Sequence, residues 1–237
     1  MIELCDFDPL EPIIASKYYK EKERNNRWSE AYYYKLLERA CKEKKLIRLC
    51  NGMYCRPKYT PFSFKLTNDD IVEIFTASGR GFEVGEKLFH DTGIMLGDYK
   101  TRTVYTSLLR DSKMKIGNVQ FIRHEIEYST LYTDTIAMLE VCANYYKICT
   151  VDHTKLIKMY TKFLRSYNDE VTHEVIEKVG YPKSAIAFLR MILDTHHIPN
   201  TLGEFLSARS VYKHPTISEI QVKSDWDRRN LRRRIGV

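Results

Sequence analysis

Apolar residues recur at helical spacing between Ser29 and about Lys44. The residues that repeat every three or four positions are Tyr33, Leu36, Leu37, Ala40 and Cys41. This pattern predicts a helix with one buried face, because residues spaced in this way line one side of an α-helix. Ser29 is the predicted N-cap, since its hydroxyl can accept a hydrogen bond from a free backbone N–H of the first turn.

A shorter helix is predicted before it, over residues 12–24, and Asn25-Asn26 forms the break between the two. After the longer helix, two strand-forming runs, Leu46–Cys50 and Met53–Arg56, flank Asn51-Gly52. Asn-Gly in this position predicts a β-hairpin closed by a type I′ turn, in which both central residues have positive φ. The order helix, break, helix and hairpin is the layout of a winged helix-turn-helix, which reads DNA with its second helix.

The rest of the chain predicts short mixed elements and then a helical part. The predicted elements are a helix at 67–77 capped by Thr67 or Asn68, a glycine-rich turn at 78–81, a helix at 82–92, strands at 101–108 and 119–126, and helices at 129–148, 152–166, 169–179 and 182–195. Residues 201–209 could form one more helix, and the segment from 214 onward has no strong period.

These elements predict an α+β fold, with an N-terminal winged helix-turn-helix followed by a mainly helical domain that contains a small β-sheet. The DNA-binding domain is expected to span residues 1–62, and the second domain residues 63–237. The expected parts of the second domain are a small α/β part at 63–126, a helical part at 127–213 and a basic tail at 214–237.

Positive charge gathers at both ends of the chain. The net charge is +7, but residues 17–58 hold thirteen Lys and Arg against five Glu, and residues 223–237 hold six against two Asp. The remainder is therefore net acidic. A basic stretch that coincides with a helix and a hairpin favours a nucleic-acid partner, because Lys and Arg neutralise phosphates and release counterions.

Double-stranded DNA is accordingly the predicted partner. We expect Tyr34, Lys35 and Arg39 to enter the groove from the second helix. Arg48, Asn51 and Arg56 would line the wing beside the DNA backbone. The remaining candidate contacts are Arg27, Ser29 and Lys42.

Residues 36–57, which read LLERACKEKKLIRLCNGMYCRP, resemble the N-terminal domain of the AbiEi-family antitoxins of type IV toxin–antitoxin systems. The matching motifs are Ile47-Arg48-Leu49, Gly52-Met53-Tyr54 and Pro57, and Lys44-Lys45 stands where the family usually has a glycine. The resemblance extends over roughly residues 29–125. It implies a regulator of abortive infection that binds inverted repeats in its own promoter and represses its operon. It also implies that a second domain counteracts a nucleotidyltransferase-like toxin.

Three other interpretations of the same residues stay open. One is a winged-helix regulator without a toxin partner, and another is a protein-interaction module whose basic face meets an acidic partner. The third is an accessory protein of a nuclease or transferase. Either a monomer in solution or a dimer on DNA fits the pattern. The five arginines of the tail either keep the chain in solution or contact DNA or an acidic or RNA-like surface: Arg228, Arg229, Arg232, Arg233 and Arg234.

No catalytic residue, cofactor or metal site is predicted, so we expect a protein that is not an enzyme. Gly79, Gly81 and Gly85 are spaced one residue too widely for the dinucleotide fingerprint, and a helix-to-helix turn explains them. A helix N-cap explains Asp69-Asp70, and a solvated helix face explains Glu140. The six cysteines contain no CxxC pair and are expected to be buried reduced thiols. With no apolar run of roughly 18 residues and no secretory signal, we expect a cytoplasmic protein without a membrane span.

Overall fold

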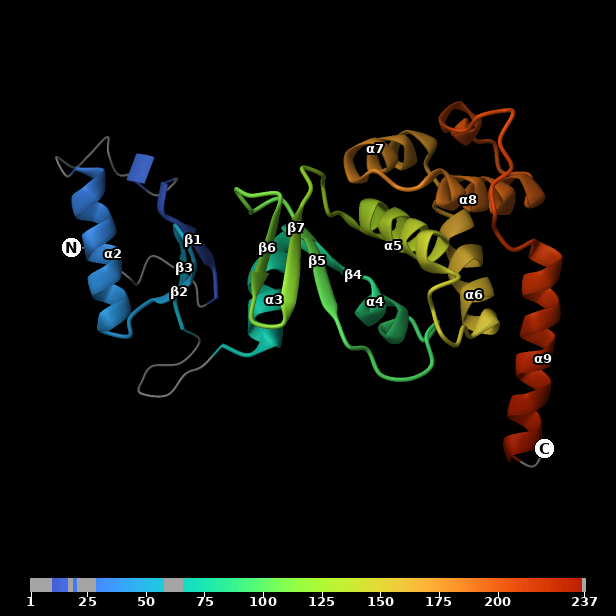
Figure 1. Ribbon diagram of the computed structural model, residues 1–237, viewed down its shortest axis with the longest axis horizontal. Coiled ribbons are helices and arrows are strands. Elements are labelled where there is room, and N and C mark those ends of the chain that lie inside the picture. Colours follow the sequence, from blue (N-terminus) through green and yellow to red (C-terminus); the bar gives the residue numbers. More distant parts are fainter. Residues whose placement is uncertain (1–9, 17–18, 21–28, 58–65, 236–237) are drawn as a thin grey trace. The chain divides into compact units, whose positions relative to one another are not determined.

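The protein is described by a computed structural model (Figure 1). The described residues are 10–16, 19–20, 29–57 and 66–235, with side chains from 230 onward left out. The chain is an α+β protein, as predicted. Contacts within the chain divide it into two units, of which the first comprises residues 1–77 and 115–119 and the second comprises residues 78–114 and 120–237.

The first unit contains a three-stranded antiparallel sheet with the order β1-β3-β2. Its strands are β1 (Pro12–Ile14), β2 (Ile47–Cys50) and β3 (Met53–Cys55). The prediction of a helix from residue 12 is therefore wrong for residues 12–14, although Ala15-Ser16 and Tyr19-Lys20 are helical. A three-residue run carries too little periodicity to separate strand from helix. Pro12 is tolerated because β1 is an edge strand, where a missing N–H breaks no central ladder.

Helix α2 (Glu30–Lys42) packs against this sheet with the predicted face. Tyr33, Leu37 and Ala40 are buried, and they form a core cluster with Leu46 and Tyr54. Helix α3 (Asn68–Thr76) follows in the same unit. The predicted cap at Thr67 is confirmed and forms a full capping box, in which the Thr67 hydroxyl accepts from the backbone N–H of Asp70 while the Asp70 carboxylate accepts from that of Thr67.

A second sheet has the strand order β4-β5-β7-β6. Its strands are β4 (Gly81–Val84), β5 (Arg102–Thr106), β6 (Lys113–Ile116) and β7 (Val119–Arg123). The predicted helix at 82–92 is wrong in its first part, since β4 pairs antiparallel with β5 and the helix α4 spans Glu86–Asp91 alone. Strand β6 lies between the two strands predicted at 101–108 and 119–126, in a segment for which no strand was expected. Strands β4 and β6 are too short for their pattern of apolar and polar residues to predict a strand, and hydrogen bonds to neighbouring strands stabilise them.

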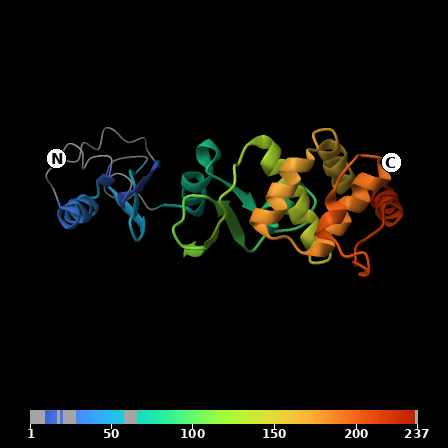
Figure 2. The same ribbon diagram turned by 90° about the horizontal axis from the view of Figure 1, so that it is seen from above.

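The helical part of the second unit follows the predicted order, and Figure 2 shows its helices grouped together. The helices are α5 (Thr130–Asn144), α6 (His153–Leu164), α7 (Asp169–Val179) and α8 (Lys183–Thr195). Helix α5 lies at the centre, in contact with α6, α7, α8 and β4. Every residue from Thr135 to Cys142 is buried for this reason, whereas a surface helix buries one face. A 3₁₀ turn at Leu202–Phe205 stands in place of the helix suggested for 201–209.

The segment that was expected to be a tail without a strong period is helix α9 (Ile217–Ile235). Its first turns dock on α6 through Ile217, Ile220 and Ser224, all of which are buried. The Asp227 carboxylate accepts from the backbone N–H of His153 at 3.1 Å and lies 2.9 Å from its Nδ1. The buried stripe is narrow and interrupted by a serine, which is why the apolar pattern did not reveal the helix.

The expectation that Glu140 lies on a solvated face is also wrong. Its side chain belongs to the buried centre of α5 and is 5% exposed. Within the described part of the chain, no helix is long and apolar enough to cross a membrane.

Candidate nucleic-acid interface

The outer face of α2 carries the predicted groove contacts. Ser29 caps the helix, because its hydroxyl accepts from the backbone N–H of Tyr32 at 3.3 Å. Lys35, Arg39 and Lys42 follow at intervals of four and three residues and are all exposed. Such spacing places them in one stripe on the side of the helix opposite its packed face. We name these three residues the α2 stripe.

Tyr34 does not belong to this stripe. It is half-buried and packs against the core cluster of the first unit, with its ring 6.3 Å from that of Tyr33. On a helix it shares a side with Leu37 and Cys41, which are three and seven positions later. The expectation that Tyr34 points away from the core is therefore wrong.

Tyr32 is the aromatic residue that lies beside the α2 stripe. Its side chain is 47% exposed, and it precedes Lys35 by three residues. The helical spacing of Tyr32 from Lys35 and Arg39 predicts that it lies on the exposed face, whereas its position in the run Tyr32-Tyr33-Tyr34 does not distinguish it from its neighbours. Glu38 is also exposed on this side, so the face carries one acidic side chain among its basic ones.

The β2–β3 hairpin forms at the predicted position, but its turn differs from the expected one. Gly52 has a φ of +73°, whereas Asn51 has no positive φ, so the turn is not type I′. The strand register shifts between Arg48 and Cys50, which accommodates an extra residue in β2. The prediction of a hairpin at Asn51-Gly52 holds, and the predicted turn type does not.

Arg48 is held at the tip of this hairpin by its neighbours. Its Nη2 donates to Asn51 Oδ1 at 2.5 Å, and its Nε donates to the carbonyl of Cys50 at 3.4 Å. Both Arg48 and Asn51 are exposed. The Asn51 amide oxygen therefore orients the guanidinium, which keeps its remaining N–H groups for an external acceptor.

The other predicted contacts have different surroundings. The Ser29 hydroxyl already caps α2. Arg56 follows β3 and is half-buried. Arg27 lies outside the described residues. In the C-terminal helix, Arg228 and Arg229 are exposed, while the side chains of Arg232, Arg233 and Arg234 are not described. The residues that the structure brings together as one exposed surface on α2 are thus Lys35, Arg39 and Lys42.

The five described cysteines lie in differing environments. Cys55 and Cys142 are buried, Cys41 and Cys50 are half-buried, and Cys149 is exposed. Burial raises the pKa of the Cys55 thiol to about 12, which keeps it protonated. The expectation of buried thiols is therefore wrong for Cys149, and Cys5 lies outside the described residues.

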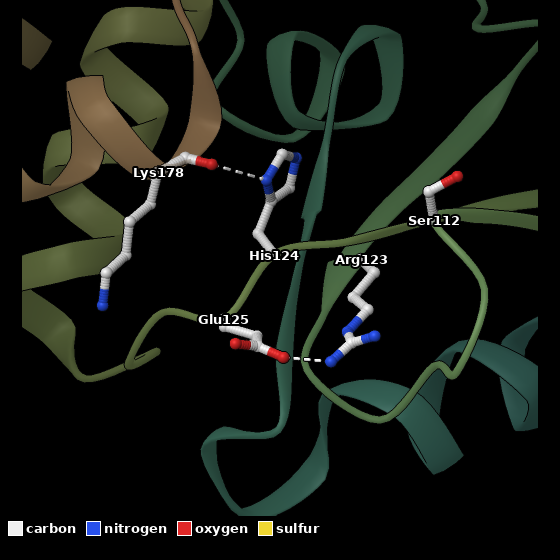
Figure 3. A pocket seen from close by; sticks show the side chains of 5 residues that line it. All are labelled: Ser112, Arg123, His124, Glu125 and Lys178. Carbon is white, nitrogen blue, oxygen red and sulfur yellow. Dashed lines mark hydrogen bonds and ion pairs between the residues drawn. The ribbon is translucent and has the colours of Figure 1, made fainter.

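The second unit contains an open pocket of about 440 Å³, lined by Ser112, Arg123, His124, Glu125 and Lys178 (Figure 3). Its charged groups already have partners. Arg123 pairs with Glu125, and Lys178 donates to Glu174 at 2.7 Å. The carbonyl of Lys178 lies 3.1 Å from His124 Nδ1, and burial lowers the pKa of this imidazole. The pocket therefore presents internally compensated charges beside an imidazole whose charged form is disfavoured by burial.

No group of three or more His, Cys, Asp or Glu side chains that could hold a metal ion occurs among the described residues.

Comparison with known proteins gives little further information. No family model matches the chain, and no curated protein matches it. Among solved structures, the crystal structure of the RV2827C protein from Mycobacterium tuberculosis is similar at a TM-score of 0.37, with 9% sequence identity over 86% of this chain and 78% of that one. At this distance the likeness says nothing about function.

Proposed function

We propose that this protein is a transcriptional regulator that binds promoter DNA through the α2 stripe and the β2–β3 hairpin. The observation that carries the proposal is the exposed alignment of Lys35, Arg39 and Lys42 opposite the packed face of α2. A helix of this kind fits the major groove, and its cations can reach both phosphates and base edges.

The architecture of the first unit supports the same role. After strand β1, the helical residues 15–16 and 19–20, helix α2 and the β2–β3 hairpin follow one another along the chain, an order that is compatible with a winged helix-turn-helix. Arg48 projects from the hairpin with its guanidinium oriented by Asn51, which suits contact with a phosphate. A protein-interaction module would also tolerate a cationic helix, but it would not need an oriented arginine at the tip of the neighbouring hairpin.

Within this role, we propose an antitoxin of a type IV toxin–antitoxin operon that represses its own promoter in the cytoplasm. This part rests on the resemblance of residues 36–57 to the AbiEi-family antitoxins. Its partner would be a nucleotidyltransferase-like toxin, counteracted by the second unit. Inverted repeats upstream of the operon would be the DNA target.

The deciding experiment measures binding of the purified protein to a fluorescently labelled duplex from upstream of its own gene, and to a shuffled duplex of equal length. Anisotropy titrations over a range of KCl concentrations give both the affinity and the salt slope. We expect clear preference for the upstream duplex. Equal affinity for both duplexes would contradict a promoter-binding role.

A matched pair of variants then locates the interface. In one variant Lys35, Arg39 and Lys42 are changed to Gln, and in the other three exposed lysines of the second unit are changed to Gln: Lys113, Lys158 and Lys183. Both lose three positive charges. Each lost phosphate contact flattens the salt slope by about 0.9, so the first variant should lose up to roughly 3 and the second almost nothing. Equal losses would indicate that net charge rather than the α2 stripe drives binding.

The antitoxin part has a separate test. Co-expression of this chain with a toxin gene encoded beside it should restore growth, and residues 78–237 should be required for the rescue. Failure of the rescue with intact promoter binding would leave a regulator without a toxin partner.

A further inference from the structure

A second cavity of the second unit, of about 410 Å³, lies beside α4, β4, β5 and α5. Val84, Phe89, Met95 and Ile148 give it apolar walls, and Glu140 also lines it. We name this cavity the Glu140 pocket. Its volume falls in the range of small-molecule sites, which combine apolar walls with a few polar groups that fix the ligand.

Glu140 is a buried carboxylate with unequal oxygens. Its Oε1 accepts from the Tyr105 hydroxyl at 2.8 Å and from the Tyr181 hydroxyl at 3.1 Å. Its Oε2 receives a single long contact, from Asn144 Nδ2 at 3.4 Å. A carboxylate oxygen can accept two hydrogen bonds, so Oε2 retains most of its capacity. The two tyrosines fix the position of the carboxylate and leave one oxygen available.

No lysine or arginine of the described chain forms an ion pair with this carboxylate. Lys147 is close enough to lower the pKa of Glu140 by its charge, but its Nζ lies at the exposed rim and donates to Asn144 Oδ1 at 3.3 Å. Burying a carboxylate without a cationic partner is unfavourable. A cationic partner from outside the protein would relieve this cost by stabilising the charged form of Glu140. The first pocket differs, since Arg123 and Lys178 have carboxylate partners of their own.

We propose that the Glu140 pocket binds a small organic cation, with an amine, amidine or guanidine nitrogen on Glu140 and an apolar body against Phe89 and Met95. The nitrogen donates to Oε2, and a charged donor on a charged acceptor in a poorly solvated site makes a strong hydrogen bond. An anion in this pocket would be repelled by the same carboxylate. The inference is independent of the proposed DNA-binding role, which rests on the first unit.

The test uses three probes of nearly equal shape, which are benzamidine (a cation), benzamide (neutral) and benzoate (an anion). Isothermal titration calorimetry on the full chain gives their affinities, and two-dimensional NMR gives the site from the amides that shift. We expect benzamidine to bind most tightly and benzoate most weakly, with shifts at residues that line the Glu140 pocket. Equal affinities, or shifts confined to other surfaces, would overturn the proposal.

Two substitutions identify the group that holds the cation. Glu140→Gln keeps the shape and the tyrosine contacts but removes the charge, and it should weaken benzamidine binding about 10-fold or more while changing benzamide little. Glu177→Gln removes an exposed carboxylate of α7 that does not line the pocket and should change neither affinity. Equal losses in both variants would contradict a specific contact at Glu140.

A third substitution tests whether weaker binding in Glu140→Gln could result from loss of the fold. Lys147→Met removes a cation from the rim, which repels a cationic ligand, and it should tighten benzamidine binding roughly two- to fivefold at low salt. An increase in affinity cannot come from unfolding. Unchanged binding would indicate that the ligand does not sense the rim charge, and weaker binding would indicate that Lys147 favours the ligand; either result would overturn the proposed orientation.

Discussion

The substitution Glu140→Gln has a stability consequence whose sign and size follow from the burial of this side chain. Burial raises the pKa of Glu140 above its ordinary value of 4.5, and the hydrogen bonds from Tyr105 and Tyr181 oppose the rise without cancelling it. The folded protein therefore holds the Glu140 proton more tightly than the unfolded chain does. The contribution of this proton to stability is fully present below pH 4.5, and it is lost as pH rises through the folded-state pKa.

The magnitude follows from linkage. Each unit by which the folded-state pKa exceeds the unfolded one lowers the free energy of unfolding at neutral pH by about 1.4 kcal/mol relative to acid pH. Glutamine has nearly the same shape, accepts the same tyrosine hydrogen bonds and does not ionise. The variant therefore lacks this loss, and its stability relative to the native chain should rise by about 1.4 kcal/mol per unit of pKa elevation between pH 4 and 8. A constant offset between the two proteins, caused by the new amide N–H₂, does not affect this trend.

Urea denaturation followed by circular dichroism at half-unit pH steps measures the difference. Taking the variant minus the native value removes the pH dependence of other carboxylates, such as Glu86 and Glu174, whose pKa values are lowered by hydrogen bonds. The exposed control Glu177→Gln should stay within about 0.5 kcal/mol of the native chain throughout. If the native chain instead gained stability over Glu140→Gln with rising pH, the carboxylate would be favoured in its charged form and the reasoning from burial would be refuted.

Three further predictions concern other parts of the molecule. Arg48→Ala should flatten the salt slope of DNA binding by about 0.9, and an unchanged slope would remove the hairpin from the interface. Thr67→Ala removes the capping box of α3 and should cost about 0.5–2 kcal/mol in urea denaturation, whereas no loss would mean that water replaces the cap. Asp227→Ala removes the acceptor for the backbone N–H of His153, so the amides of α9 should exchange about 10-fold faster with deuterium. Unchanged exchange would indicate that the buried face of α9 suffices for docking.

Local signals in the sequence determined much of the fold. The helices α2, α3 and α5–α8 begin and end within a few residues of their predicted positions, because N-caps such as Ser29 and Thr67 and apolar periodicity act over a few residues. The hairpin at Asn51-Gly52 is local for the same reason. Lys35, Arg39 and Lys42 could be assigned to one helix face from spacing alone.

Tertiary structure decided what depends on distant segments. Strands β1 and β4 are too short to show a period, and they exist because β3 and β5 supply the hydrogen-bond partners. Helix α9 has a narrow apolar stripe, and it is ordered by its contact with α6. Tyr34 was wrongly assigned to the exposed face of α2, because the burial of three consecutive tyrosines depends on how the helix is rotated about its axis against the sheet.

The burial of Glu140 could not be predicted from the sequence for the same reason. A glutamate in a helix is ordinarily solvated, and nothing in its neighbours along the chain indicates otherwise. Its burial results from the packing of α5 among three helices and a strand, and its hydrogen bonds come from Tyr105 and Tyr181, 35 and 41 residues away. The sequence by itself determined where α2, α3 and α5–α8 form and that Lys35, Arg39 and Lys42 share one face of α2. Only the tertiary structure decided which polar groups are taken out of water, because burial depends on segments that meet through folding.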